Sequence, residues 1–171
     1  MAMGLVDRTE TRERPARRLL PTRTDAELER LRTLEGARML LERARALVAA
    51  GWVQDTFYVV RDRHGATRPV SPFGLLLLNR ADVVGACLVG AVSHATASVD
   101  RRAGRRAQAA AAVDALHAAL FGGSADTPYP ETRAARVREL ARWNDEPGRT
   151  RQDVLELMDR AVSRTIHSAI R

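Results

Sequence analysis

The first residues whose types could do chemistry are a cysteine and a histidine within one apolar stretch. Cys87 and His94 are seven residues apart, so on an α-helix they share one face. A thiol nucleophile and an imidazole base must approach to about 3 Å. Seven residues at 1.5 Å each separate these two by about 10.5 Å along the helix axis. We therefore predict that Cys87 is buried and inert, and that His94 is hydrogen-bonded at the edge of the core.

A cysteine-dependent enzyme is the alternative hypothesis for Cys87 and His94. Its imidazole would then come from elsewhere in the chain, and the sequence offers His64, His117 and His167. No two histidines stand at a helical ligand spacing, and no carboxylate cluster completes a metal site. No phosphate-binding glycine loop or nucleophile elbow is found. We expect no metal and no other cofactor, and we favour a function without catalysis.

Residues 143–150, with the sequence Trp-Asn-Asp-Glu-Pro-Gly-Arg-Thr, carry the most local information. Pro147 and Gly148 suit the two central positions of a type II turn, in which the glycine takes a positive φ. Thr150 and Asp153 have the spacing of a capping box and predict the start of a helix. The pattern therefore predicts a tight, capped connection between two helices.

The same loop supplies candidate ligand-binding residues. Two indoles with amides, a carboxylate and a guanidinium suit a small polar ligand or a peptide. They would equally form a cap that ties helix ends together, and we favour the cap. The candidate residues are Trp52, Gln54, Trp143, Asn144, Asp145 and Arg149.

Three motifs make the chain resemble an uncharacterised family of small actinobacterial and phage proteins, a domain of unknown function. They are Gly51-Trp52-x-Gln54, Cys87-x-x-Gly90-Ala91, and the 143–150 loop leading into Asp153-Val154-Leu155. The resemblance covers roughly residues 37–163. It implies a shared fold and adds no chemistry, because no activity is assigned to such a family.

The charge balance raises nucleic acid as an alternative partner. The net charge is +7, and all 28 basic residues are arginine. A basic cluster at Arg101, Arg102, Arg105 and Arg106 would straddle phosphates if the segment were helical. No aromatic residue stands nearby to stack on bases. A GC-rich genome explains the arginine bias equally well, so we favour a protein or small-molecule ligand over nucleic acid.

No segment of the sequence predicts a membrane span or a secretory signal. The apolar run from Val83 to Val92 is shorter than the ~20 residues that cross a bilayer. The N-terminus is polar and arginine-rich. The single cysteine suits a reducing compartment. We expect a cytoplasmic protein with no membrane partner.

The elements that must position these residues are mostly helical. Residues 1–23 read as a flexible arginine-rich tail, and residues 24–171 as a single helical domain. Thr24 and Glu27 form a capping-box pattern that opens a helix ending at Gly51, with Gly36 as a possible break. Further helices are expected at 107–121, 131–143 and 154–169. Residues 57–70 predict a β-hairpin, which Pro69 confines to a sheet edge.

Residues 81–97 are expected to form the buried helix around which the others pack. Ala86, Gly90, Ser93 and Ala97 make a stripe of small side chains along which a neighbouring helix can approach closely. The predicted fold class is mainly α, with about five helices around this central apolar helix and one small β-hairpin.

Overall fold

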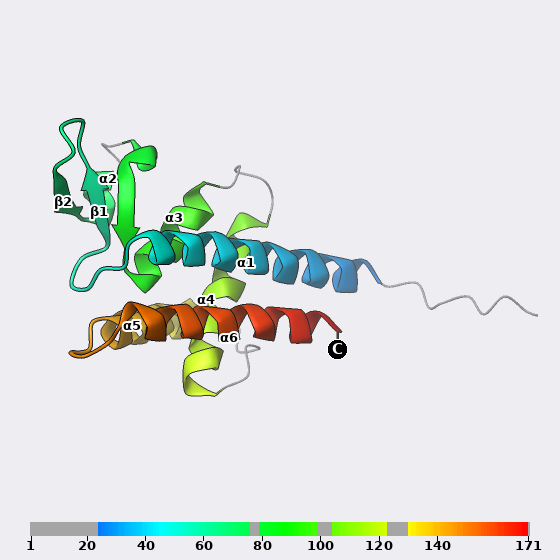
Figure 1. Ribbon diagram of the computed structural model, residues 1–171. Coiled ribbons are helices and arrows are strands. Elements are labelled where there is room, and N and C mark those ends of the chain that lie inside the picture. Colours follow the sequence, from blue (N-terminus) through cyan, green and yellow to red (C-terminus); the bar gives the residue numbers. More distant parts are fainter. Residues whose placement is uncertain (1–23, 76–78, 99–103, 123–129, 171) are drawn as a thin grey trace, which may run out of the picture.

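The computed structural model describes residues 24–75, 79–98, 104–122 and 130–170. The predicted tail, residues 1–23, lies outside this part of the chain. The fold is mainly helical with one small antiparallel sheet, as expected from the sequence (Figure 1). In chain order the elements are α1 (Asp25–Ala50), β1 (Tyr58–Arg61), β2 (Thr67–Val70), α2 (Pro72–Leu75), the 3-10 turn η1 (Arg80–Asp82), β3 (Val83–Ala86), α3 (Leu88–Ala97), α4 (Arg105–Phe121), α5 (Pro130–Asn144) and α6 (Arg151–Ile170).

Helix α1 begins at the predicted cap and continues without the possible break. The Thr24 side chain accepts a hydrogen bond from the Glu27 backbone N–H, and the Glu27 carboxylate accepts one from the Thr24 N–H. The helix passes through Gly36, where an added Cβ would lie 2.3 Å from Cδ of Gln108 on α4. The glycine therefore leaves room for the Gln108 side chain.

Helices α1 and α6 lie side by side and antiparallel (Figure 1). Arg45 of α1 donates two hydrogen bonds to the Asp159 carboxylate of α6, at 2.6 and 3.0 Å. Nearer the chain ends, Arg30 donates to the Ser168 carbonyl oxygen at 2.8 Å. Both helices also pack on α4. Of the described helices, none combines the length and apolarity needed to cross a bilayer.

The prediction of one helix over residues 81–97 is wrong in its first half. Residues 83–86 form β3, which pairs antiparallel with β1, so that Tyr58 lies opposite Ala86. The hairpin strand β2 occupies the other side of β1 and forms an edge, as Pro69 predicts. The Asn79 side chain accepts from the Ala81 N–H and caps η1 rather than a long helix. A third strand therefore stabilises the hairpin, because two strands alone are barely stable in water.

Most residues of the 81–97 segment from Val83 to Val92 are nevertheless buried by neighbouring elements, whereas Ser93 is exposed. Cys87, Leu88 and Ala91 are at most 6 % exposed and belong to the interior, together with leucines from α1, α4, α5 and α6. The close approach at Gly90 differs from the expectation, because an added Cβ would lie 2.3 Å from the Phe57 carbonyl oxygen. The backbone entering β1, and not a helix, occupies the space that this glycine leaves.

The boundaries of the later helices follow the sequence signals. Gly122, with φ of 70°, ends α4 in the left-handed conformation that glycine adopts readily, at the expected boundary of this helix. Helix α5 starts at Pro130, one residue before the expected start at residue 131. Proline suits that position because the first helical N–H has no intrahelical partner. These helices form a core with α1 in which Leu41, Leu116, Leu157 and Met158 are at most 1 % exposed.

Candidate functional site

Asn144, at the end of α5, is the centre of a buried polar network. Its side chain is 0 % exposed. Its Oδ1 accepts hydrogen bonds from the Trp52 indole N–H at 2.9 Å and from the Leu88 backbone N–H at 3.1 Å. Its Nδ2 donates to the Val53 carbonyl at 3.2 Å and to the Asp145 carboxylate at 2.7 Å. One side chain thus joins α5, the segment after α1, and the start of α3.

Gln54 and Asp145 extend this network to the loop backbone. Gln54 Nε2 donates to the carbonyl oxygens of Asn144 at 2.9 Å and Glu146 at 3.0 Å. The Asp145 carboxylate accepts from the backbone N–H of Asp55 at 3.1 Å. Asp55 has φ of 56°, the one positive φ at a non-glycine residue in the described chain. We name the set Trp52, Gln54, Asn144 and Asp145 the asparagine hub.

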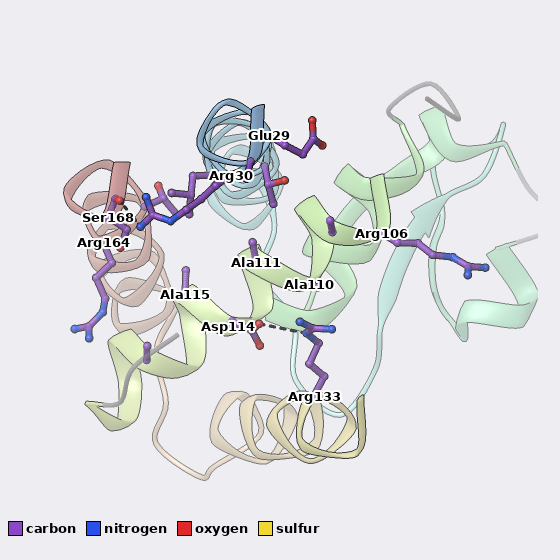
Figure 2. Close-up of a pocket in the computed structure, with 16 residues that line it drawn as sticks. Glu29, Arg30, Arg106, Ala110, Ala111, Asp114, Ala115, Arg133, Arg164 and Ser168 are labelled. Carbon is purple, nitrogen blue, oxygen red and sulfur yellow. Dashed lines mark hydrogen bonds and ion pairs between the residues drawn. The ribbon is translucent and has the colours of Figure 1, made fainter. Parts of the chain in front are cut away.

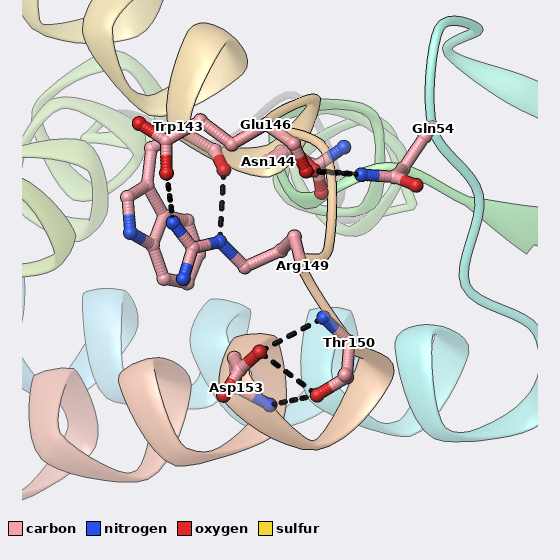
Figure 3. A network of polar contacts seen from close by, with 7 residues as sticks. All are labelled: Gln54, Trp143, Asn144, Glu146, Arg149, Thr150 and Asp153. Carbon is pink, nitrogen blue, oxygen red and sulfur yellow. Dashed lines mark hydrogen bonds and ion pairs between the residues drawn. The ribbon is translucent and has the colours of Figure 1, made fainter.

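Arg149 covers the other side of the loop (Figure 3). Its guanidinium carbon lies 4.0 Å from the centroid of the Trp143 ring, and its Nε donates to the Trp143 carbonyl at 3.0 Å. It also pairs with the Glu146 carboxylate. Gly148, with φ of 84°, and the hydrogen bond from the Arg149 N–H to the Glu146 carbonyl form the expected turn.

The helix after the turn starts with the predicted capping box. The Thr150 N–H donates to the Asp153 carboxylate at 2.8 Å, and the Asp153 N–H donates to Thr150 Oγ1 at 3.2 Å (Figure 3). The hydrogen bonds that the Thr150 N–H and hydroxyl donate to this carboxylate lower the pKa of Asp153 from its ordinary value. The start of α6 is therefore fixed by local interactions.

The candidate ligand-binding residues are brought together by the fold. Trp52, Gln54, Asn144 and Asp145 form the hub, and Trp143 with Arg149 lies against it. Their polar atoms bind one another and the neighbouring backbone, as a structural cap requires. A ligand role for them stays a prediction.

Cys87 takes a structural position at the start of α3. It is 6 % exposed, and its Sγ accepts a hydrogen bond from the Gly90 N–H at 3.3 Å, so the sulfur caps the helix. Burial raises the pKa of the thiol, and the nearby Asp145 carboxylate adds to the rise. His94 is half-buried, and its ring centroid lies 6.4 Å from that of Tyr58. These surroundings disfavour a thiolate at neutral pH.

A second site, which the sequence analysis missed, lies between helices at the opposite end of the molecule. It is a groove of about 1080 Å³ bordered by α1, α4, α5 and α6 (Figure 2). Five of the seven residues that α4 contributes are alanines, and we name the site the alanine groove. Its lining residues are Ala26, Glu29, Arg30, Thr33, Leu34, Arg106, Ala107, Ala110, Ala111, Asp114, Ala115, Ala118, Arg133, Arg164, Thr165 and Ser168.

A charged cluster forms the border of the alanine groove at α5. Asp114 on α4 is 5 % exposed, and its carboxylate accepts hydrogen bonds from Arg133 Nε at 3.2 Å and from Arg136 Nη1 at 2.7 Å. Figure 2 shows Arg133 reaching from α5 toward Asp114. We name Asp114, Arg133 and Arg136 the Asp114 cluster.

The family to which the chain belongs follows from comparison with known proteins. A family model described as a family of unknown function (DUF6197) matches residues 32–164. The chain belongs to this family. The match agrees with the resemblance expected over residues 37–163 and takes in both the asparagine hub and the Asp114 cluster. Comparison with curated proteins and with solved structures finds no match.

Membership of the DUF6197 family assigns no reaction, so the remaining candidates are judged by geometry. Arg101 and Arg102 lie outside the described residues. Arg105 and Arg106 stand in the first turn of α4. Arg106 lines the alanine groove, whereas Arg105 lines a separate apolar groove of about 340 Å³ between α3, α4 and α5. The described pair thus faces two different grooves, and nucleic-acid binding stays an untested alternative.

The sequence of this DUF6197 member contains a signal for the Asp114 cluster that was not used. Asp114 is the only acidic residue in the α4 sequence RRAQAAAAVDALHAALF. Arg133 and Arg136 are three residues apart, so they share a face of α5. A single carboxylate on a helix more often faces water, so this pattern is compatible with an ion pair but does not by itself predict a buried one. Within the described chain, no group of three or more histidine, cysteine or acidic residues could hold a metal ion.

Proposed function

We propose that this DUF6197 protein is a non-enzymatic binding module whose ligand occupies the alanine groove. The observation that carries the proposal is a groove of about 1080 Å³ with an apolar alanine side and charged residues at its border. Ligand pockets commonly measure about 300–1000 Å³ and combine apolar walls with a few polar groups. Arg30 and Arg106 at the groove are exposed, so the groove is open to solvent.

The asparagine hub supports this choice of site by contrast. Its side chains are engaged with each other and with the backbone, so a ligand would have to displace buried hydrogen bonds. The alanine side of the groove has no such bonds to break. The buried Cys87 thiol, which caps α3, also favours binding over thiol catalysis.

The proposal includes two expectations about the setting of the protein. A regulatory module of this kind would act in the cytoplasm, which its single cysteine favours. The expected source is an actinobacterium or its phage, on the strength of the motif resemblance.

The binding test uses two probes that share one apolar body. We expect 4-phenylbutyrate and its neutral amide, 4-phenylbutanamide, each to give saturable amide shifts in a ¹⁵N NMR titration. The shifted residues should gather on Ala107–Ala118 of α4 and on 26–34 of α1. Shifts that gather on 52–54 and 143–149 would place the site at the hub instead. The absence of saturable groove shifts with both probes would contradict the proposal.

A substitution pair checks that the groove volume is what binds. Ala110→Leu inserts a larger side chain on the α4 side of the groove. Ala46→Leu makes the same change at an exposed position on α1 that does not line the groove. We expect Ala110→Leu to weaken both probes about tenfold and Ala46→Leu to leave both affinities unchanged. Circular dichroism of each variant checks that the fold is intact.

A further inference from the structure

The Asp114 cluster has two guanidinium groups and one carboxylate. Arg136 has a side chain that is 8 % exposed, and the Arg133 side chain is 37 % exposed. Each contributes one nitrogen to the hydrogen bonds with Asp114. Among the described residues, the buried Arg136 Nε is the one buried side-chain polar atom that has no hydrogen-bond partner. The cluster thus holds one positive charge more than Asp114 neutralises.

The charge in excess of Asp114 favours a counter-anion where the cluster borders the groove. A guanidinium keeps its proton, because its pKa is too high for it to become neutral. Arg136 is buried and paired with Asp114, whereas the Arg133 side chain is 37 % exposed, so the charge in excess is accessible at Arg133. Of the two arginines, Arg133 lines the alanine groove. An anion that enters the groove can reach it.

Arg133 contacts Asp114 through Nε, so the side of its guanidinium formed by the two Nη atoms is available to a ligand. In the described chain Arg133 uses Nε toward Asp114, and its two Nη atoms have no hydrogen-bond partner. Two Nη nitrogens can bind one carboxylate in the bidentate manner typical of arginine. The apolar part of such a ligand would then lie along Ala110 and Ala111 of α4, which also line the groove.

From these observations, and resting on the function proposed above, we propose that the ligand of the alanine groove carries a carboxylate that Arg133 binds. The excess of one positive charge in the Asp114 cluster matches the single charge of a carboxylate. A phosphate monoester brings about −1.5 to −2 and would repel the Asp114 carboxylate that shares Arg133. Glu29 also lines the groove and further disfavours a doubly charged ligand. Arg30, Arg106 and Arg164 line it as well and attract any anion, so their charge does not select between the two.

The decisive comparison is between 4-phenylbutyrate and 4-phenylbutanamide. In NMR titrations at pH 7 and low salt, we expect the carboxylate to bind the groove about tenfold more tightly than the amide, because charge-assisted hydrogen bonds to Arg133 are lost in the amide. Equal affinities for the two probes, with groove shifts still present, would overturn the proposal of a carboxylate ligand. The proposal that the groove binds a ligand would still be supported. Tighter binding of 4-phenylbutyl phosphate would also overturn it in favour of a phosphate ligand.

Substitutions of arginine assign the preference to one residue. Arg133→Gln should reduce the preference for the carboxylate to less than twofold and leave the affinity for the amide unchanged. Arg138→Gln removes the same charge from an exposed position on α5 and should keep the tenfold preference. Arg133→Gln leaves Asp114 and Arg136 as a one-to-one pair, so we expect it to fold. If it does not fold, Arg133→Lys keeps the charge without the planar fork and should lose most of the preference. A preference unchanged in the Arg133 variant would overturn the assignment.

Discussion

At the scale of single residues, Asn144 is a buried polar side chain whose hydrogen bonds connect three separate segments of the fold. Its amide supplies an acceptor to an indole and to the first N–H of α3, and a donor to a loop carbonyl. Leu88 N–H lies at the N-terminus of a helix, where no intrahelical acceptor exists. The buried amide oxygen is therefore the acceptor that both of these donors use in the described part of the chain.

Removing this amide should destabilise the fold strongly. Asn144→Ala leaves the Trp52 indole N–H and the Leu88 N–H without their acceptor in a dry environment. We expect the free energy of unfolding, measured by urea titration, to fall by about 3 kcal/mol. Asn79→Ala removes an exposed amide that accepts one N–H and should cost about 1 kcal/mol or less. Similar losses in the two variants would show that the hub contributes little.

The Cys87 thiol offers a test of the cysteine-dependent alternative. Burial raises its pKa, so the thiolate fraction of the native protein at pH 7.5 lies below that of an exposed cysteine. We expect iodoacetamide to alkylate native Cys87 at least about tenfold more slowly than the urea-unfolded chain at that pH. The alkylation rate of native Cys87 should rise only at a pH above the ordinary pKa of a cysteine thiol. Rapid alkylation of the native protein below pH 8 would favour a catalytic thiol.

At the scale of elements, the sequence predicts helices well where apolar periodicity and caps agree. Thr24 with Glu27, Gly122, and Thr150 with Asp153 each mark a real helix end. The helix predicted over residues 83–86 is wrong because the sequence Val-Val-Gly-Ala is apolar throughout and shows neither a helical nor a strand periodicity. Helix and strand are equally compatible with such a run. Pairing with β1 decides the outcome, and that contact is not visible in local sequence.

For the candidate sites too, one part could be predicted from the sequence and another could not. The loop at 143–150 was found because turn and cap residues have fixed spacing, and the structure brings Trp52 and Gln54 to it. The alanine groove depends on how α1, α4, α5 and α6 are arranged, and a volume between helices has no sequence motif. Asp114 was passed over because a single acidic residue on a helix usually faces water.

The contact between α3 and the sheet can be tested at Gly90. Alanine favours a helix by about 1 kcal/mol over glycine, so propensity alone predicts a gain in stability. The added Cβ would instead lie 2.3 Å from the Phe57 carbonyl, which belongs to rigid backbone. We expect Gly90→Ala to lower the free energy of unfolding by more than about 2 kcal/mol. Ser93→Ala, at an exposed position on the same helix, should be neutral or slightly stabilising. A stabilised Gly90→Ala variant would contradict the close approach.

At the scale of the whole molecule, the hub and the groove lie at opposite ends of α1 and α6. At one end the hub lies beside the sheet, the start of α3 and the α5–α6 loop, which Figure 1 shows close together. At the other end, residues of the first turns of α1 and the last turns of α6 line the groove. Helix α1 packs on α3, α4, α6 and β3 along its length. The hydrogen bonds of the asparagine hub, which stabilise one end of the molecule, are thus far from the alanine groove at the other end.

This arrangement predicts cooperative unfolding with α1 as the shared element. Both tryptophans, Trp52 and Trp143, lie at the hub end, so their fluorescence reports that end, whereas far-UV circular dichroism reports all the helices. We expect the two urea transitions to coincide. Leu41→Ala, at a fully buried position of α1, should lower the free energy of unfolding obtained from both transitions by about 3 kcal/mol. Leu28→Ala, at a position 37 % exposed, should lower it by less than about 1 kcal/mol. A fluorescence transition that precedes the loss of helix would mean that the hub end unfolds separately, and α1 would then not couple the two ends.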